Sequence, residues 1–189
     1  MSEPVASVVI PVKDFTRAKL RLAPELDPSE REALARRMAS IVVGAAAPLP
    51  VVIVCDSEPV RDWATSEGAR VIWTPGLGLN GAVQAGVDQL ADEGCATAIV
   101  AHSDLPLARE LAFVAATPGV TLVPDRRHDG TNVLAVPTDI GFRFAYGAGS
   151  FTAHRAEATR LGQQIRIVND ARLSWDVDLP TDLVLPACP

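Results

Sequence analysis

Three carboxylates follow two segments of this chain that the sequence predicts to be extended. Asp104 comes three residues after the apolar run 97–101, and Asp176 and Asp178 come after a shorter run, 165–168, near the C-terminus. Ligands of open α/β sheets bind outside the carboxyl ends of the strands, where we expect these side chains. Asp176 and Asp178 are two residues apart and therefore point the same way from an extended backbone. Carboxylate oxygens are the ligands that Mg²⁺ prefers, so all three aspartates are candidate ligands of a magnesium ion that holds a phosphate substrate.

Both acidic segments also have a purely structural interpretation. Asp104 precedes a predicted helix over 107–116, and aspartate is a favoured N-cap residue. Asp178 likewise precedes Pro180, where a short helix is expected to begin. Caps alone do not explain why three carboxylates fall at two predicted strand ends, and this coincidence favours the metal site.

Four cationic residues cluster in the segment that follows the first predicted strand. They are Lys13, Arg17, Lys19 and Arg21. Lysine and arginine are the usual partners of phosphate groups, so this loop is a candidate binding site for a nucleoside triphosphate. The chain has neither the P-loop pattern G-x-x-x-x-G-K-S/T nor the dinucleotide pattern G-x-G-x-x-G. A solvated basic loop is the alternative interpretation.

The composition restricts the class of protein. A net charge of -6 argues against nucleic acid as a partner and makes the basic loop a local anion site. Three cysteines without metal-ligand spacing indicate reduced thiols and a cytoplasmic protein. The apolar stretch 41–55 contains three helix breakers, and residues 2–4 lack the basic start of a signal peptide, so no membrane partner is expected. The length predicts a single domain over residues 1–189.

Strand and helix patterns alternate through the first half of the chain and predict an α/β protein. The first strand pattern is continuously apolar, which is typical of a parallel sheet covered on both faces. We therefore expect a Rossmann-like α/β/α sandwich in which the strands within 120–136 form a hairpin or an antiparallel edge. The predicted strands are 7–12, 51–55, 70–73, 97–101, 120–123, 131–136 and 165–168, and the predicted helices are 28–47, 58–67, 79–93, 107–116 and 150–161.

A glycine-rich loop, 147–151, opens the last long predicted helix. Gly147 and its neighbours would leave N–H groups free at the positive end of the helix dipole, which is a site for an anion. Ser150 is at the same time a candidate N-cap. His154 lies one turn after Ser150, where it either faces the anion or is an ordinary surface histidine, and the surface position is favoured.

Two shorter motifs complete the candidate set. Residues 129–132, Asp-Gly-Thr-Asn, are typical of a hairpin turn, and Thr131 and Asn132 also offer hydrogen-bond donors to an acid substrate. Leu79 and Asn80 open a helix beside glycines that allow a base or ribose to approach the backbone. Asn80 as a simple N-cap is the alternative.

In their order along the chain, these motifs resemble those of the CofC/FbiD family, the guanylyltransferases of coenzyme F420 biosynthesis. The resemblance covers about residues 7–185. The residues that carry it are Ile10-Pro11-Val12-Lys13, Ala18-Lys19, Arg21-Leu22, Leu79-Asn80, Asp104-Leu105-Pro106, Asp129-Gly130-Thr131-Asn132, Gly147, Ser150-Phe151, His154, Asp176, Asp178 and Asp182-Leu183. One departure from the expected pattern is His102-Ser103, where a small or Pro-Ala type pair would stand before Asp104.

The resemblance implies the fold of nucleotide-diphospho-sugar transferases and a specific reaction. GMP from GTP is joined to phosphoenolpyruvate, or alternatively to 2-phospho-L-lactate or another three-carbon phospho-acid, and pyrophosphate leaves. It also implies a hand-off of the product to the next transferase of the pathway. The implied roles are catalysis for Lys19 and Asp104, phospho-acid binding for Thr131, Gly147 and Ser150, nucleotide binding for Lys13, Lys19, Arg21, Leu79 and Asn80, and Mg²⁺ binding for Asp104, Asp176 and Asp178.

Two other functions compete with this one. A molybdenum-cofactor nucleotidyltransferase would share the fold but is expected to have a G-x-G-x-R type first loop, which this chain lacks. A non-catalytic nucleotide-binding module is the alternative from a different class. The presence of all three candidate metal carboxylates argues against it.

Overall fold

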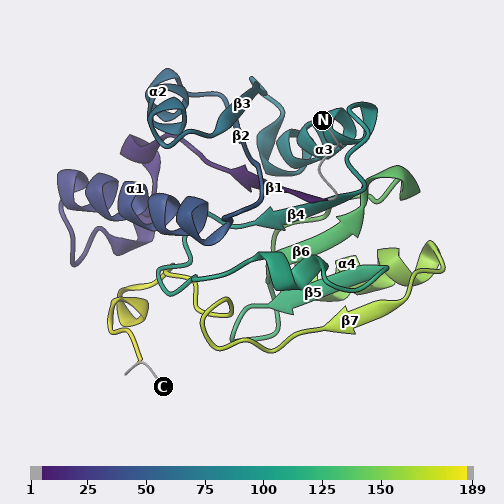
Figure 1. The fold of residues 1–189 in the computed structure, drawn as a ribbon. Coiled ribbons are helices and arrows are strands. Elements are labelled where there is room, and N and C mark those ends of the chain that lie inside the picture. Colours follow the sequence, from purple (N-terminus) through teal and green to yellow (C-terminus); the bar gives the residue numbers. More distant parts are fainter. Residues whose placement is uncertain (1–5, 187–189) are drawn as a thin grey trace.

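A computed structural model describes residues 6–186, and within this range the chain forms one seven-stranded sheet. The strands follow the spatial order β3-β2-β1-β4-β6-β5-β7 (Figure 1). All neighbouring pairs are parallel except those of β6, which is antiparallel to both β4 and β5. The strand bounds are β1 Ala6–Pro11, β2 Val51–Cys55, β3 Arg70–Trp73, β4 Thr97–Ala101, β5 Val120–Pro124, β6 Thr131–Pro137 and β7 Ile165–Ile167.

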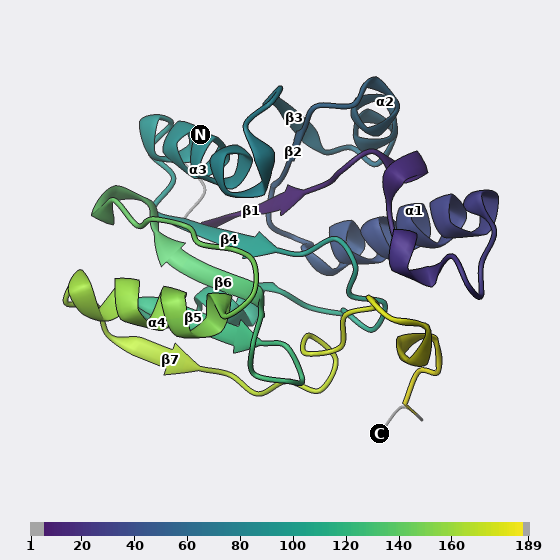
Figure 2. The ribbon, with the colours of Figure 1, turned by 180° about the vertical axis from the view of Figure 1, so that it is seen from behind.

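Four α-helices within residues 6–186 cover the two faces of this sheet. α1 (Pro28–Ala45) and α2 (Glu58–Ser66) pack on one face, and α3 (Gly78–Asp92) and α4 (Ser150–Arg160) pack on the other (Figures 1 and 2). Alternate residues of each central strand enter the two cores, which explains why the strand sequences are apolar throughout. The predicted mostly parallel α/β sandwich is therefore confirmed.

Short 3-10 helices occupy several connections. They are η1 Phe15–Arg17, η2 Leu20–Leu22, η3 Ala112–Ala115, η4 Thr138–Ile140 and η5 Pro180–Leu183. α1 begins as its sequence indicates, because Asp27 accepts from the backbone N–H of Glu30, and the Glu30 carboxylate accepts from the N–H of Asp27.

The prediction of a helix over 107–116 is wrong. Only η3 forms there, although Ala108 and Leu111 are three residues apart and both buried, as on one face of a helix. The backbone N–H of Leu111 donates instead to the carbonyl of Ala45, at the C-terminal end of α1. This tertiary hydrogen bond satisfies an orphan carbonyl of α1 and keeps the segment in successive turns.

The predicted hairpin within 120–136 is confirmed, but its strands do not form the edge of the sheet. β6 lies inside, between β4 and β5, and β7 is the edge strand. Because β6 runs against β4, its first residues lie beside the last residues of β4, with Ala101 opposite Val133. Thr131 and Asn132 therefore reach the same edge of the sheet as Asp104.

None of the helices described within residues 6–186 combines the length and the hydrophobicity that crossing a bilayer requires. Cys55 and Cys95 are buried free thiols, and Cys188 lies outside the described residues.

Candidate active site

A cavity of ≈ 690 Å³ opens at the carboxyl ends of β1 and β4 and the start of β6, within the size range of sites for small molecules. Thr131 and Asn80 are absent from its lining. The sequence-predicted residues that line it are Lys13, Arg17, Lys19, Arg21, Leu79, Asp104, Asn132, Gly147, Ser150, Asp176 and Asp178.

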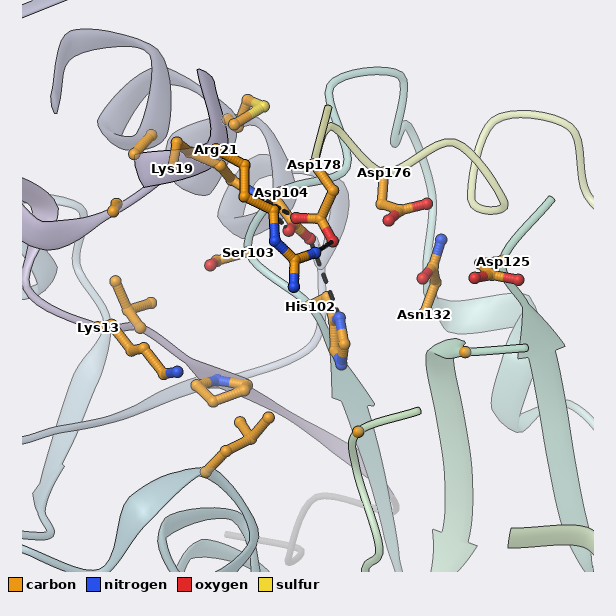
Figure 3. Close-up of a pocket in the computed structure, with 18 of the residues that line it drawn as sticks. Lys13, Lys19, Arg21, His102, Ser103, Asp104, Asp125, Asn132, Asp176 and Asp178 are labelled. Carbon is orange, nitrogen blue, oxygen red and sulfur yellow. Dashed lines mark hydrogen bonds and ion pairs between the residues drawn. The ribbon is translucent and has the colours of Figure 1, made fainter. Parts of the chain in front are cut away.

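An ammonium group lies at the centre of the acidic residues (Figure 3). Lys19 Nζ donates to Asp104 Oδ2 at 2.5 Å and to Asp178 Oδ1 at 3.2 Å. Arg21 Nη1 lies 3.8 Å from the other oxygen of Asp178, on the exposed side of the cavity. Asp104 and Asp178 therefore act as ion-pair partners of Lys19 in this state, and neither side chain is a helix cap.

Packing holds Lys19 in this place against backbone strain. Its backbone is left-handed (φ 54°, ψ 37°), a conformation that costs a lysine free energy and persists only where the surroundings impose it. Leu22, three residues on, packs with Met38 of α1 and with Val177, between the two C-terminal aspartates. One small apolar cluster thus brings the basic loop and the C-terminal acidic segment together.

Charge and burial compete at the ion pair. Burial alone would raise the pKa of Asp104, but the charges of Lys19 and His102, together with the hydrogen bond from Lys19, outweigh it and hold this pKa below its usual value. Burial would likewise lower the pKa of Lys19, and the carboxylates of Asp104 and Asp178 raise it instead. Both groups are therefore charged at neutral pH.

Asp176 has no cationic partner of this kind in the described chain. Burial, followed by the nearby carboxylate of Asp104, raises its pKa. Asp176 Oδ1 and Asp104 Oδ1 are buried and find no hydrogen-bond partner within residues 6–186. No three His, Cys, Asp or Glu side chains of the described chain gather into a metal-binding group, and Lys19 lies between two of the candidates. The two unpartnered oxygens nevertheless fit a hard cation, which would satisfy both.

Asp182 supports the acidic segment, and the sequence argument assigned it no role. It is fully buried, and its Oδ2 accepts the backbone N–H groups of Asp178 and Leu179 at 2.9 and 2.8 Å. Its Oδ1 accepts from the Arg126 guanidinium, which also donates to the carbonyl of Asp176. An acid two residues after Pro180 is the signal for this cap, because it occupies the third helical position.

The glycine-rich loop faces the ion pair across the cavity. Gly147 and Gly149 have φ values of 136° and 71°, which favour glycine, and Gly149 rather than Ser150 is the N-cap residue of α4. The backbone N–H groups of Gly147 and Ala148 have no hydrogen-bond partner within residues 6–186. Ser150 Oγ accepts the N–H of Thr131 at 3.0 Å, which leaves the hydroxyl hydrogen of Ser150 free.

His154 is neither at the surface nor in the cavity. It is fully buried, so the favoured surface position is wrong. Phe142, Phe144 and Tyr146 surround its ring. Burial, with a smaller effect from the charge of His102, lowers the pKa of His154 to about 4.

Leu79 and Asn80 have different positions at the start of α3. Leu79 lines the cavity, whereas the amide of Asn80 pairs with the backbone of Tyr146. Asn80 Oδ1 accepts the N–H of Tyr146 at 2.6 Å, and Asn80 Nδ2 donates to its carbonyl at 3.2 Å. The N-cap residue of α3 is Leu77, so Asn80 is not a cap. Its two hydrogen bonds connect α3 to the segment that leads into the glycine-rich loop.

The unexpected His102 lies beside Asp104. Its Nδ1 lies 4.0 Å from Asp104 Oδ1, and its ring packs against Tyr146 with the centroids 5.1 Å apart. Lys13 extends from the other side of the pocket (Figure 3), and within residues 6–186 it forms no ion pair. The cavity thus has cationic groups on the side of the basic loop and unpartnered N–H groups on the side of α4.

Known proteins with similar sequences share almost the whole chain. A phosphoenolpyruvate guanylyltransferase of Sphaerobacter thermophilus is 37% identical, over 93% of this chain and 89% of the relative. A 2-phospho-L-lactate guanylyltransferase of Methanothermobacter thermautotrophicus is 35% identical, over 93% and 81%. A 3-phospho-D-glycerate guanylyltransferase of Phenylobacterium zucineum is 33% identical, over 95% and 88%.

Solved structures agree on the fold. A protein of Desulfovibrio desulfuricans G20 described as a nucleotide-diphospho-sugar transferase superposes with a TM-score of 0.76 at 16% identity, over 95% of this chain and 85% of that one. Glucosyl-3-phosphoglycerate synthase of Mycobacterium tuberculosis, solved with Mn²⁺, matches with a TM-score of 0.54 at 15% identity, over 87% and 69%. The family model for CofC-like guanylyl transferases matches residues 6–185, and the chain belongs to that family.

Proposed function

We propose that this protein joins GMP from GTP to phosphoenolpyruvate and releases pyrophosphate. One observation carries the proposal: the Lys19 ion-pair cluster and the unpartnered N–H groups at Gly147 and Ala148 face each other across a single cavity. Two anionic substrates that must react with each other need such a site, with one anion held on either side. The relative at 37% identity carries the name of this activity.

The reaction requires positioning and charge neutralisation rather than a general base. The phosphate oxygen of the acid is already an anion, so it attacks the α-phosphorus of GTP directly. A new P–O bond forms, and the bond between the α-phosphorus and the bridging oxygen breaks. The electron pair leaves with pyrophosphate. Cations near the leaving group lower the barrier because negative charge develops there.

On the nucleotide side, we assign the triphosphate to Lys13, Lys19 and Arg21, and the nucleoside to Leu79 and Asn80. Lys13 supports this role because it is exposed and unpaired in the described chain. Leu79 lines the cavity, and Asn80 supports it from α3. Lys19 is the proposed catalytic cation, exchanging its carboxylates for phosphate oxygens when GTP binds.

On the acid side, we assign the phospho-acid to Gly147, Ser150 and Thr131. Gly147 and Ser150 line the cavity and offer an N–H and a hydroxyl hydrogen without partners in the described chain. Thr131 is fully buried directly behind Ser150 and fixes its hydroxyl through the backbone N–H.

Mg²⁺ is the proposed cofactor, with Asp104, Asp176 and Asp178 as its ligands. The unpartnered oxygens of Asp104 and Asp176 support this assignment. When bound, the ion would neutralise phosphate charge and orient the triphosphate. Asp104 has the central role, since it touches Lys19 and approaches Asp176.

The test is pyrophosphate release from GTP and Mg²⁺ with each of three acids: phosphoenolpyruvate, 2-phospho-L-lactate and 3-phospho-D-glycerate. Mass detection should identify the product, and the next transferase with its deazaflavin acceptor should be present to draw the product off. Release with phosphoenolpyruvate alone is the expected result. Pyrophosphate release with only one of the other acids would assign that acid as the substrate. Binding of GTP without pyrophosphate release with any acid would favour a non-catalytic module.

We further propose that the chain acts as one cytoplasmic domain that passes its product to that next transferase. The continuous sheet and the free thiols of Cys55 and Cys95 support this arrangement. A diphosphate-linked phospho-acid is a reactive product, which favours a direct hand-off.

A further inference from the structure

His154 connects the two chain segments that form the acid side of the cavity. Its Nε2 lies 3.0 Å from the backbone nitrogen of Ala145, which leads into the glycine-rich loop. Its Nδ1 lies 3.0 Å from Thr131 Oγ1, at the start of β6. The ring is fully buried among aromatic side chains, so no water competes for either contact.

The Ala145 contact fixes the direction of every hydrogen bond in this network. A backbone N–H can only donate, so Nε2 accepts and carries no hydrogen. The ring is neutral, since burial lowers its pKa to about 4, and its single hydrogen is therefore on Nδ1. Nδ1–H donates to Thr131 Oγ1, and the N–H of Thr131 donates to Ser150 Oγ.

The consequence is a set of donors that all lack partners in the described chain. Ser150 Oγ is already used as an acceptor, so its hydroxyl hydrogen is available to the cavity. On the other segment, His154 holds Ala145 and the Asn80 amide holds Tyr146, so the chain enters Gly147 in a fixed direction. The N–H groups of Gly147 and Ala148 follow directly.

We propose that His154 is a positioning residue for the phospho-acid, because its neutral ring holds β6 and the glycine-rich loop at the spacing that aims these donors at one anion. This role rests on the proposed function. His154 does not touch the substrate and takes no part in proton transfer. Because the nucleotide side of the cavity is built on other elements, loss of the ring should weaken binding of the acid and leave binding of GTP intact.

The test compares apparent KM values for both substrates in three variants. His154→Leu keeps the volume apolar but removes both hydrogen bonds, and we expect a roughly tenfold rise in the KM for phosphoenolpyruvate with less than a twofold change for GTP. His154→Asn places an amide near the position of Nδ1 and should restore part of the loss by donating to Thr131. Phe142→Leu is the matched control, because it loosens the same aromatic cluster without touching the polar network.

Several outcomes would overturn the role of His154. Equal rises in both KM values for His154→Leu would indicate general destabilisation, and the same split in Phe142→Leu would indicate packing alone. A rise below twofold in folded His154→Leu would show that the ring positions nothing. Wild-type protein that releases no pyrophosphate with any phospho-acid would instead overturn the proposed function, and the positioning role with it.

A second measurement needs neither substrate nor a folded Leu variant. Nitrogen-15 NMR of the wild-type protein should show one of its three histidines as the Nδ1–H tautomer, without titration between pH 5 and 8. Substitution of His102 and His128 by Gln assigns that signal by elimination. An Nε2–H tautomer, or protonation within that range, would refute the hydrogen-bond network.

Discussion

Replacing Lys19 by Met keeps an unbranched side chain and removes the ammonium group, with its charge and its hydrogen bonds to Asp104 and Asp178. In the unliganded protein this change leaves Asp104 without its ion-pair partner beside the buried carboxylate of Asp176. The side chains of Lys19 and Asp104 are only 11% and 18% exposed, so solvent screens the pair weakly. Removing one partner of a buried ion pair costs about 3 kcal/mol or more of unfolding free energy, and we expect a loss of that order at pH 7.5.

The pH dependence gives the sharper test. In the wild type, the lowered pKa of Asp104 contributes stability that is present above the unfolded value of 3.8 and is lost as the pH falls through the lowered value. In Lys19→Met, burial without the ammonium raises the pKa of Asp104, so the folded state binds a proton more readily than the unfolded state. The variant should therefore gain stability relative to the wild type as the pH falls from 7.5 towards 4.5.

Urea unfolding at pH 7.5, 6.0 and 4.5 in the presence of a chelator measures both effects. Arg37→Met, a surface cation without a described ion pair, is the matched control for loss of one positive charge. A loss of stability that is equal at all three pH values, or no loss relative to the control, would refute the interpretation of Lys19 as the neutralising partner of Asp104.

Three further predictions follow from the site and the core. Asp104→Asn should remain folded, as judged by circular dichroism, and lose roughly 10²–10³-fold in kcat; full activity with unchanged Mg²⁺ dependence would refute its role as metal ligand. Ser150→Ala should raise the KM for the phospho-acid more than the KM for GTP, and equal effects would argue against the assigned acid site. Gly86→Ala should lower the unfolding free energy by about 1–3 kcal/mol, because a Cβ there would meet Val54 Cγ1 at 2.7 Å; an unchanged urea midpoint would show that α3 can shift away from the sheet.

The sequence was sufficient where local pattern determines structure. The central strands of the sheet are apolar because both of their faces are buried, and all seven strands were predicted close to their observed positions. The start of α1 was predicted from the pairing of Asp27 with Glu30, which is complete within four residues. The prediction of a helix over 107–116 was wrong because the structure there depends on a contact distant in sequence. The N–H of Leu111 donates to the carbonyl of Ala45, at the end of α1.

The candidate site divides in the same way. Strand ends predicted Asp104 and Asp178 at one edge of the sheet, and both line the cavity together with Gly147 and Ser150. The partnership of Lys19 with Asp104 joins residues 85 positions apart, and no local pattern encodes it. The burial of His154 likewise depends on how the preceding segment with Phe142 and Tyr146 packs over the helix, and the helical spacing from Ser150 does not contain this information.

The reversed direction of β6 has a consequence for how the protein folds. β1 to β4 build one part of the sheet through parallel crossovers, and β5 to β7 build the other, so the β4–β6 pairing is the seam between two sequence-contiguous halves. The cavity lies across that seam, with Asp104 on one side and Ser150 on the other. The ion pair of Lys19 with Asp178 at this cavity joins residues 159 positions apart. Contacts of such large sequence separation carry the highest loop-closure cost and tend to form late. Each half can therefore acquire much of its structure while the cavity is still open, and the competence to bind both substrates at once should be among the last properties that a refolding chain regains.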